Sequence, residues 1–269
     1  MTKADELLLT TVKLDVITNQ ERHRAGTAFF YTFDLKGRNA MVLVSNRHVL
    51  EDAHIVNCYI ALDLESDEVQ TACWTMFLQK DNIITHPDSK VDLAIVPIGG
   101  SMDEHAQIGI NYDYRSFDKE TMPTTDELRE ISVMHNIVMV GYPNGQIDVV
   151  NNTPLCRHGI TATPPAKNFN GERAFLVDIG CAPGSSGSPI IAYDSIWREL
   201  PNGQLTKVDQ ARLIGIFCAG DRSKVNGVTV PKDGEEPQKV NAYIPYGIGK
   251  AISVQCLDEF VPLLEKLCK

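Results

Sequence analysis

The chain has 269 residues, 43% of them hydrophobic and 22% charged, a balance that is typical of a folded globular protein and excludes intrinsic disorder. Its formal net charge of −10 would repel a polyanion, so the composition disfavours nucleic acid as a partner. The seven cysteines are odd in number and widely scattered, which argues against a disulfide framework and predicts reduced thiols in a cytoplasmic protein.

The first residues do not resemble a secretion signal. Asp5 and Glu6 place negative charge where a signal peptide carries positive charge, and the apolar run Leu7–Leu9 is short. Every apolar run in the sequence is shorter than the roughly 20 residues that a membrane-spanning helix needs. We therefore expect no membrane partner.

Short runs rich in Val, Ile, Phe and Tyr, bounded by Gly, Pro, Asn and Asp, predict strands along most of the chain. In chain order these runs cover residues 8–17, 26–32, 40–45, 55–62, 92–97, 137–141, 174–179, 189–192 and 213–218. Helical periodicity is convincing only at residues 126–131 and 254–267. Of two polar interruptions, residues 101–130 are expected to connect two halves of the fold and residues 221–239 to form a long surface loop. The sequence thus predicts an all-β fold with a C-terminal helix.

The stretch Gly180–Pro189 lies between two apolar runs and is rich in small residues. A serine hydroxyl is a weak nucleophile that needs a base within hydrogen-bond reach and N–H donors for the oxyanion that its attack generates. Ser186 is the candidate nucleophile, because Gly184 can adopt backbone angles that turn its N–H and that of Ser186 toward one point. Taken alone, the stretch is interpreted equally well as an ordinary turn.

Two further residues could complete a nucleophilic site with Ser186. His48 follows an apolar strand and three polar residues, a position that holds a base rigidly beside an opening. His86 and His54 also lie near polar turns and remain alternatives. Asp92 begins an otherwise apolar strand, and a buried carboxylate needs a donor such as a histidine N–H.

At these residues the chain resembles the trypsin-like peptidase family, most closely its bacterial HtrA-type and glutamyl-endopeptidase-like branches. The order His48, Asp92, Ser186 is the chymotrypsin order. The resemblance covers roughly residues 24–253, and the stretches that match family motifs are Gly26–Phe29, Ser45–Val49, Asp92–Ile95, Gly141–Gly145 and Gly184–Pro189.

The resemblance implies two antiparallel six-stranded β-barrels. Residues 1–115 would form the first barrel with His48 and Asp92, residues 116–253 the second barrel with Ser186, and residues 254–269 a C-terminal helix. The implied activity is that of a serine endopeptidase, which cleaves a protein or peptide substrate through an acyl-enzyme without a metal or cofactor. His48 would be the general base and Asp92 the orienting carboxylate, and the backbone N–H groups of Gly184 and Ser186 would form the oxyanion hole.

The family's positions also locate a specificity pocket for the substrate side chain before the scissile bond. The pocket would be formed by Gly180, Cys181, Phe217, Cys218, Ala219, Gly220, Gly249 and Ala251. None of these residues is acidic and Phe217 narrows the pocket, so a small or medium apolar side chain is expected. A register slip of one residue would instead bring Lys250 into the pocket and favour an acidic side chain.

Two departures from the family concern regulation. Ser185 stands where digestive zymogens carry the aspartate that pairs with a newly cut N-terminus, so activation by N-terminal cleavage is not expected. The segment after Ser253 is too short for the PDZ module of HtrA proteins. We expect a regulatory protein partner, or the segment 221–239, to gate the cleft instead.

Other functions receive less support. A catalytically silent protease fold that binds peptides is the main alternative, because a fold does not guarantee activity. The segment Gly247–Ala251 lacks the frame of a phosphate-binding loop, and no His-Glu-x-x-His motif or close Cys/His cluster predicts a metal site. Viral relatives of the family use a cysteine nucleophile, but the nucleophile position holds Ser186, so Cys181 is assigned to the pocket.

Overall fold

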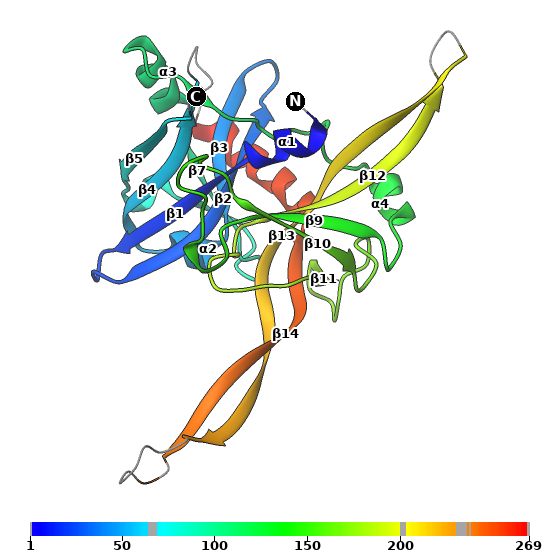
Figure 1. Ribbon diagram of the computed structural model, residues 1–269. Coiled ribbons are helices and arrows are strands. Elements are labelled where there is room, and N and C mark those ends of the chain that lie inside the picture. The colour runs from blue at the N-terminus through cyan, green and yellow to red at the C-terminus, as the bar shows by residue number, and fades with distance from the viewer. Residues whose placement is uncertain (1, 64–68, 200–202, 230–235, 237, 268–269) are drawn as a thin grey trace.

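The computed structural model of the chain describes residues 2–63, 69–199, 203–229, 236 and 238–267. Within these ranges strands dominate and form two antiparallel sheets, followed by a short helical segment at the C-terminal end (Figure 1). The fold class predicted from the sequence, all-β with a C-terminal helix, is confirmed.

The first sheet is built from β1 (Thr11–Thr18), β2 (His23–Asp34), β3 (Asn39–Ser45), β4 (Ala53–Leu62), β5 (Thr71–Phe77), β6 (Ile84–Thr85), β7 (Ala94–Pro97) and β8 (Tyr112–Asp113). Its strands are paired in the order β5-β4-β1-β2-β3-β7-β6, with β8 against β4. Successive side chains of a strand point to opposite faces of the sheet. In β1, Val12, Leu14 and Val16 are buried, and the residues that alternate with them from residue 13 onward are half-buried. In the central strands β2 and β3 both faces are buried: Phe29 and Val44 belong to one hydrophobic cluster, and Phe30 and Leu43 to another.

The second sheet is a closed six-stranded barrel within the described residues, as the sequence predicted. It is paired in the order β10-β11-β14-β13-β12-β9 and then closes. Its strands are β9 (Asn136–Gly141), β10 (Leu155–Thr161), β11 (Ala174–Asp178), β12 (Pro189–Glu199), β13 (Leu205–Val228) and β14 (Lys239–Ser253). The first sheet differs from the expected six-stranded barrel. The short strands β6 and β8 raise its number of strands to eight, and among the described residues its end strands β5 and β6 are not paired with each other.

The helices are short and lie outside the sheets. They are α1 (Lys3–Leu8), α2 (Arg47–Leu50), α3 (Gly99–Gln107), α4 (Thr125–Glu130) and α5 (Val261–Leu267), with single turns of 3₁₀-helix at η1 (Lys80–Asn82) and η2 (Pro143–Gly145) and a longer one at η3 (Val254–Phe260). Both helical segments predicted from the sequence, 126–131 and 254–267, are present as α4 and as η3 with α5.

Three expectations about local structure were wrong or incomplete. Residue 8 lies in α1 rather than in a strand, because Thr2 and Asp5 form a reciprocal capping box that begins a helix. Strands β5 and β10 were missed, since polar residues interrupt their apolar patterns. Residues 221–228, expected to lie in a loop, continue β13; residues 230–235 and 237 lie outside the described ranges.

Two long hairpins extend beyond the barrel. One joins β12 to β13 and the other joins β13 to β14, and they project in opposite directions from the body of the fold (Figure 1). The β13–β14 hairpin is the one that contains the predicted loop. The division of the chain at residues 115 and 253 stays a prediction; β8 ends at Asp113 in the first sheet and β9 begins at Asn136 in the barrel.

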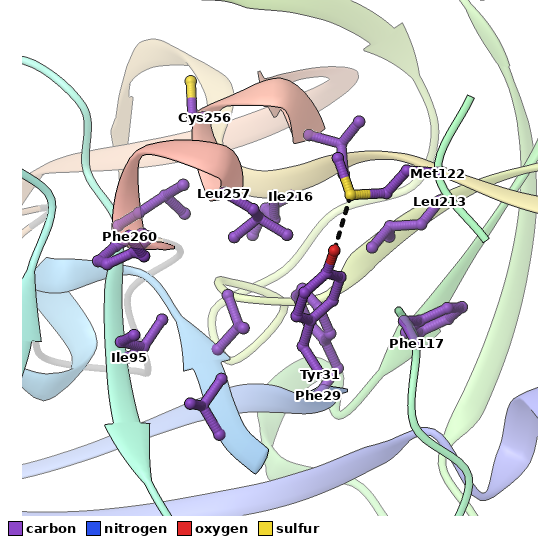
Figure 2. Close-up of a cluster of buried hydrophobic side chains, with 14 of the residues drawn as sticks. Phe29, Tyr31, Ile95, Phe117, Met122, Leu213, Ile216, Cys256, Leu257 and Phe260 are labelled. Carbon is purple, nitrogen blue, oxygen red and sulfur yellow. Dashed lines mark hydrogen bonds between the residues drawn. The ribbon is translucent and has the colours of Figure 1, made fainter. Parts of the chain in front are cut away.

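One hydrophobic cluster is shared by both sheets and the C-terminal helical segment. Figure 2 shows Phe29, Tyr31 and Ile95 of the first sheet beside Leu213 and Ile216 of the barrel and Leu257 and Phe260 of η3. The Tyr31 hydroxyl donates a hydrogen bond of 2.9 Å to the Met122 sulfur inside this cluster. Because the two sheets bury the same apolar side chains, their relative position is fixed by packing.

The cysteines that the structure describes are all unpaired, namely Cys58, Cys73, Cys156, Cys181, Cys218 and Cys256. No helix within the described ranges is long and apolar enough to cross a membrane. The expected cytoplasmic location stays a prediction.

The shared core can be tested with two phenylalanines. Phe260 is fully buried in the shared cluster, whereas the side chain of Phe77 in β5 is 71% exposed. Phe260→Ala should lower the free energy of unfolding by about 3–5 kcal/mol, because it removes a large apolar side chain and leaves a cavity. Phe77→Ala should change it by less than about 1 kcal/mol. Denaturant unfolding of both variants measures this difference, and equal losses would contradict the packing described.

Candidate active site

Ser186 lies in a tight loop between β11 and β12, and two glycines with positive φ shape this loop. The φ angles are +89° at Gly184 and +88° at Gly187, a region that favours glycine. There is also no room for a side chain at Gly184, because its first carbon would lie 2.5 Å from the carbonyl oxygen of Tyr142. Any other residue at these positions would thus strain or displace the loop that carries Ser186.

The backbone N–H groups of this loop divide into two sets. Ser185 N–H donates to the Ala182 carbonyl at 3.0 Å and Gly187 N–H donates to the Phe217 carbonyl at 2.9 Å, so both are engaged. Among the described residues, no hydrogen bond uses the N–H of Gly184 or that of Ser186. Two unengaged donors on either side of Ser185 are the arrangement that stabilises an oxyanion.

Thr27 of β2 ties this loop to the first sheet. Its backbone N–H donates to the Ser186 carbonyl at 2.9 Å and its hydroxyl donates to the Gly184 carbonyl at 2.9 Å. The same hydroxyl accepts a hydrogen bond of 3.2 Å from the N–H of Tyr142 in the barrel. The carbonyl of Thr27 accepts from the Ser45 hydroxyl at 2.7 Å, and Thr27 is fully buried. Apart from the motif Gly26–Phe29, no pattern in the sequence indicated this role of Thr27.

His48 and Asp92 are held against each other by two hydrogen bonds. His48 Nδ1 lies 2.6 Å from Asp92 Oδ2, and the backbone N–H of His48 donates to Asp92 Oδ1 at 3.0 Å. His48 lies on the single helical turn α2 that follows β3 rather than at the strand end itself. The Asp92 carbonyl accepts from the N–H of Arg47 at 3.2 Å and from the side-chain amide of Asn46 at 3.0 Å. Two contacts thus hold the carboxylate against His48, and two more hold the backbone of Asp92 against the residues before His48.

A cleft of about 290 Å³ brings His48 and Ser186 together. The residues that line it are His48, Cys181, Ala182, Pro183, Ser186, Phe217, Cys218, Ala219, Gly220, Arg222, Tyr243 and Pro245. Among the described residues, no hydrogen bond joins His48 to Ser186. Hydrogen bonds of this kind are often long before substrate binds and shorten in the complex. His48 remains 47% exposed in its side chain, so a substrate can reach the imidazole.

The other two histidines considered from the sequence lie elsewhere. His86 has a fully buried side chain; its Nε2 lies 3.2 Å from the Cys256 carbonyl and its Nδ1 accepts from the N–H of Asp88 at 3.1 Å. It joins the first sheet to η3, which is a structural role. His54 is exposed at the start of β4. Neither histidine lines the cleft with Ser186.

Only some of the residues predicted to form the specificity pocket line the cleft. Cys181, Phe217, Cys218, Ala219 and Gly220 line the cleft. Gly249 and Ala251 lie behind them, because the Phe217 ring contacts the position of Gly249 and Ala251 is fully buried opposite Phe217 in the barrel. Gly180 lies against the guanidinium of Arg157, which donates to its carbonyl at 2.6 Å.

The thiols of Cys181 and Cys218 line the cleft and are protonated at neutral pH. Burial raises the pKa of the Cys218 thiol to about 12. Burial also raises the pKa of Cys181, although nearby Arg157 partly opposes that shift. Since the thiolate is the nucleophilic form of cysteine, both residues are poor nucleophiles at neutral pH. Their place here supports the assignment of Cys181 to the pocket wall.

Lys250, the cation that a shifted register would have placed in the pocket, points elsewhere. Its ammonium group pairs with Glu172 at 2.7 Å, and it lies outside the cleft with Ser186. The lining instead includes Arg222, Tyr243 and Pro245, which the sequence did not single out. Arg222 was missed because it belongs to residues 221–239, which were expected to form a loop, and no motif pointed to Tyr243 or Pro245. Among the described residues, no three His, Cys, Asp or Glu side chains come close enough together to hold a metal ion.

Comparison with known proteins gives the family of the chain. The family model of the trypsin-like peptidase domain matches residues 26–197. The chain belongs to this family. The resemblance stated from its motifs is therefore confirmed. No curated protein matches the sequence.

The chain is also similar to solved structures. The HtrA-type protease AlgW, solved with a tripeptide, is similar with a TM-score of 0.51 at 17% identity, over 99% of this chain and 63% of that one. A serine endoprotease from Yersinia pestis is similar with a TM-score of 0.49 at 14% identity, over 99% of this chain and 68% of that one. This chain thus spans less than two thirds of the length of AlgW, and the likeness concerns the fold alone.

The hydrogen bonds of Thr27 can be tested by removing its hydroxyl. Thr27→Val keeps the shape of the side chain but leaves the Gly184 carbonyl and the Tyr142 N–H without their partner. Each unsatisfied buried group costs about 1–3 kcal/mol, so the free energy of unfolding should fall by about 2–4 kcal/mol. Thr27→Ser keeps the hydroxyl and should lose about 1 kcal/mol for the missing methyl group. Denaturant unfolding should rank wild type, Ser and Val in that order, and a Val variant as stable as the Ser variant would contradict the role of the hydroxyl.

Proposed function

We propose that the protein is a serine endopeptidase with Ser186 as nucleophile, His48 as general base and Asp92 as orienting carboxylate. The observation that carries this proposal is the arrangement in one cleft of a serine and a histidine that is held by a carboxylate at 2.6 Å. Membership of the trypsin-like peptidase family supports the reaction class. The unengaged N–H groups of Gly184 and Ser186 support the assignment of an oxyanion hole.

The proposed reaction begins when Ser186 Oγ attacks the carbonyl carbon of the scissile peptide bond. His48 Nε2 accepts the hydroxyl proton and later transfers it to the leaving amine, which yields an acyl-enzyme. Asp92 holds the proton of Nδ1, which keeps Nε2 free to accept, and it stabilises the imidazolium that forms. Water then hydrolyses the acyl-enzyme with the same base. The negative charge on the substrate oxygen is stabilised by the N–H groups of Gly184 and Ser186.

The substrate side chain before the scissile bond is proposed to be small or medium and apolar. Phe217 fills the space above Gly249, and the Cys181 sulfur closes the space beside Gly220. Carboxylates are absent from the described lining of the cleft, so a lysine or arginine side chain would find no partner there. The regulatory partner expected from the sequence stays a prediction.

The proposed triad is tested by labelling the purified protein with a fluorophosphonate, which reacts with an activated serine. We expect one adduct at Ser186 by intact mass and peptide mapping. Labelling should be lost in Ser186→Ala and fall by at least about 10³-fold in rate in His48→Ala, because the hydroxyl then lacks its base. Ser185→Ala and His54→Ala provide matched controls, since Ser185 is the neighbouring serine and His54 lies outside the cleft.

The outcome separates the two functions considered from the sequence. Labelling that requires Ser186 and His48 but neither control residue supports an assembled triad. A protein that stays unlabelled, yet binds peptides in the cleft, would instead be a catalytically silent peptide-binding module. Labelling that persists in Ser186→Ala would place the nucleophile elsewhere and contradict the assignment.

The size of the pocket is tested with a series of peptides that differ only in the residue before the scissile bond. Alanine or valine should give a kcat/KM at least about tenfold above lysine or arginine, because a long cation meets Phe217 and Cys181 without a carboxylate to pair with. The measurement is continuous hydrolysis of fluorogenic peptides. A preference for lysine or arginine would overturn the proposed pocket while leaving the triad intact.

A further inference from the structure

The outer half of the β13–β14 hairpin is a two-stranded ribbon that begins at the edge of the cleft. Beyond Gly220, the described part of β13 pairs with β14 alone, from Arg222 opposite Pro245 to Val228 opposite Lys239. The pairing of β12 with β13 ends at Ile216, so the other edge of β13 has no strand beside it in this part of the described chain. Figure 1 shows this ribbon projecting away from the barrel.

One face of the ribbon is continuous with the cleft. Residues directly opposite each other in an antiparallel pair share a face, and residues two apart along a strand do so too. This face therefore carries the pairs Arg222/Pro245, Lys224/Tyr243, Asn226/Asn241 and Val228/Lys239. Arg222, Tyr243 and Pro245 line the cleft that contains Ser186. The ribbon thus extends the floor of the cleft outward.

This cleft face of the ribbon is positively charged and exposed. Arg222, Lys224 and Lys239 lie on it, and all three are exposed. The face holds no carboxylate, and none of the ion pairs among the described residues uses these three cations. The chain as a whole carries a formal charge of −10. A concentration of positive charge beside the cleft therefore contrasts with the rest of the molecule.

The opposite face of the ribbon has a different character. It carries Ser223, Val225 and Gly227 of β13 opposite Ile244, Ala242 and Val240 of β14, and none of these is charged. Asp221, the acidic residue where the ribbon begins, accepts a hydrogen bond of 3.1 Å from the Tyr246 hydroxyl. The positive charge thus belongs to the face that the cleft shares.

We propose that this face binds an extended acidic segment of the polypeptide substrate, a proposal that rests on the proposed peptidase function. An extended peptide can add as a strand to the free edge of β13, and its alternate side chains then lie over one face. Counted from Cys218 at the cleft, Arg222, Lys224 and Lys239 lie about four, six and ten residues along the ribbon. Acidic side chains at alternate positions, about four to ten residues from the scissile bond, would meet these cations.

A protein segment fits this surface better than a nucleic acid. The free edge of β13 offers backbone N–H and C=O groups that match another polypeptide backbone. The overall negative charge of the chain opposes a long polyanion, whereas a short acidic segment lies only over the positive face. A duplex DNA oligonucleotide serves as the competitor that tests this choice.

The test compares three internally quenched peptides with the same residues around the scissile bond. One carries three glutamates at alternate positions on the N-terminal side, the second carries them on the C-terminal side, and the third carries glutamines on both sides. At low ionic strength we expect kcat/KM for one of the two acidic peptides to exceed that of the neutral peptide by about five- to tenfold. About 1 M salt, where the Debye length is about 3 Å, should abolish the difference.

Two triple variants locate the effect. Arg222→Gln, Lys224→Gln and Lys239→Gln together should make kcat/KM of the acidic peptide equal to that of the neutral peptide measured with the same variant, with no loss of stability in denaturant unfolding. The matched control removes three exposed cations elsewhere, by Lys80→Gln, Arg198→Gln and Lys207→Gln, and should preserve the preference. Equal rates for all three wild-type peptides, or a preference lost equally in both variants, would overturn the proposal.

A binding measurement separates this inference from the proposed reaction. The Ser186→Ala protein leaves peptides intact, so fluorescence anisotropy can compare its affinity for the labelled acidic and neutral peptides. Salt-sensitive preference for the acidic peptide without hydrolysis by wild type would support the surface and contradict the peptidase. Hydrolysis without any charge preference in rate or affinity would support the peptidase and contradict the surface. Displacement of the acidic peptide by duplex DNA at equal phosphate and carboxylate concentration would contradict the assignment to polypeptide.

Discussion

The two sheets share one apolar core, and the geometry of the candidate site depends on it. His48 and Asp92 come from the first sheet and Ser186 comes from the barrel, so their distance is the distance between two separately paired units. Phe29 of one sheet and Ile216 of the other belong to the same cluster. A close-packed interior resists relative movement, because sliding the sheets would open voids and lose contacts. The core thereby fixes the position of His48 and Asp92 relative to Ser186.

Hydrogen bonds also hold the loop of Ser186 against the first sheet. Thr27 bonds to the loop of Ser186 through its backbone and through its hydroxyl, at the point where the first sheet touches the barrel. Gly184 and Gly187 allow the loop to turn so that two N–H donors remain unengaged. An unpaired donor inside the fold would be costly, but Ser186 lines the cleft, where its N–H is available to a ligand. The same loop is thus held in place by hydrogen bonds and still has free N–H donors.

The long β13–β14 ribbon shows how a strand can serve two purposes along its length. From Leu213 to Cys218, β13 is buried and forms part of the barrel wall. Beyond Gly220 it leaves the barrel, exposes its edge and places Arg222 in the lining of the cleft. Charged residues on an exposed ribbon discourage nonspecific pairing with strands of other chains. Here the charges are positive, which favours an acidic partner. The proposed acidic segment follows from this distribution of charge.

The sequence by itself determined the residue types, their chain order and the all-β class, because small-residue loops, strand patterns and motif spacing are local properties. It also indicated His48, Asp92 and Ser186, whose roles stay a proposal. Only the tertiary structure decided that Thr27 joins the loop to the first sheet and that residues 221–228 form a ribbon at the cleft. Those features depend on pairing between distant segments. Hydrogen bonds across such distances leave no periodic pattern in a single sequence.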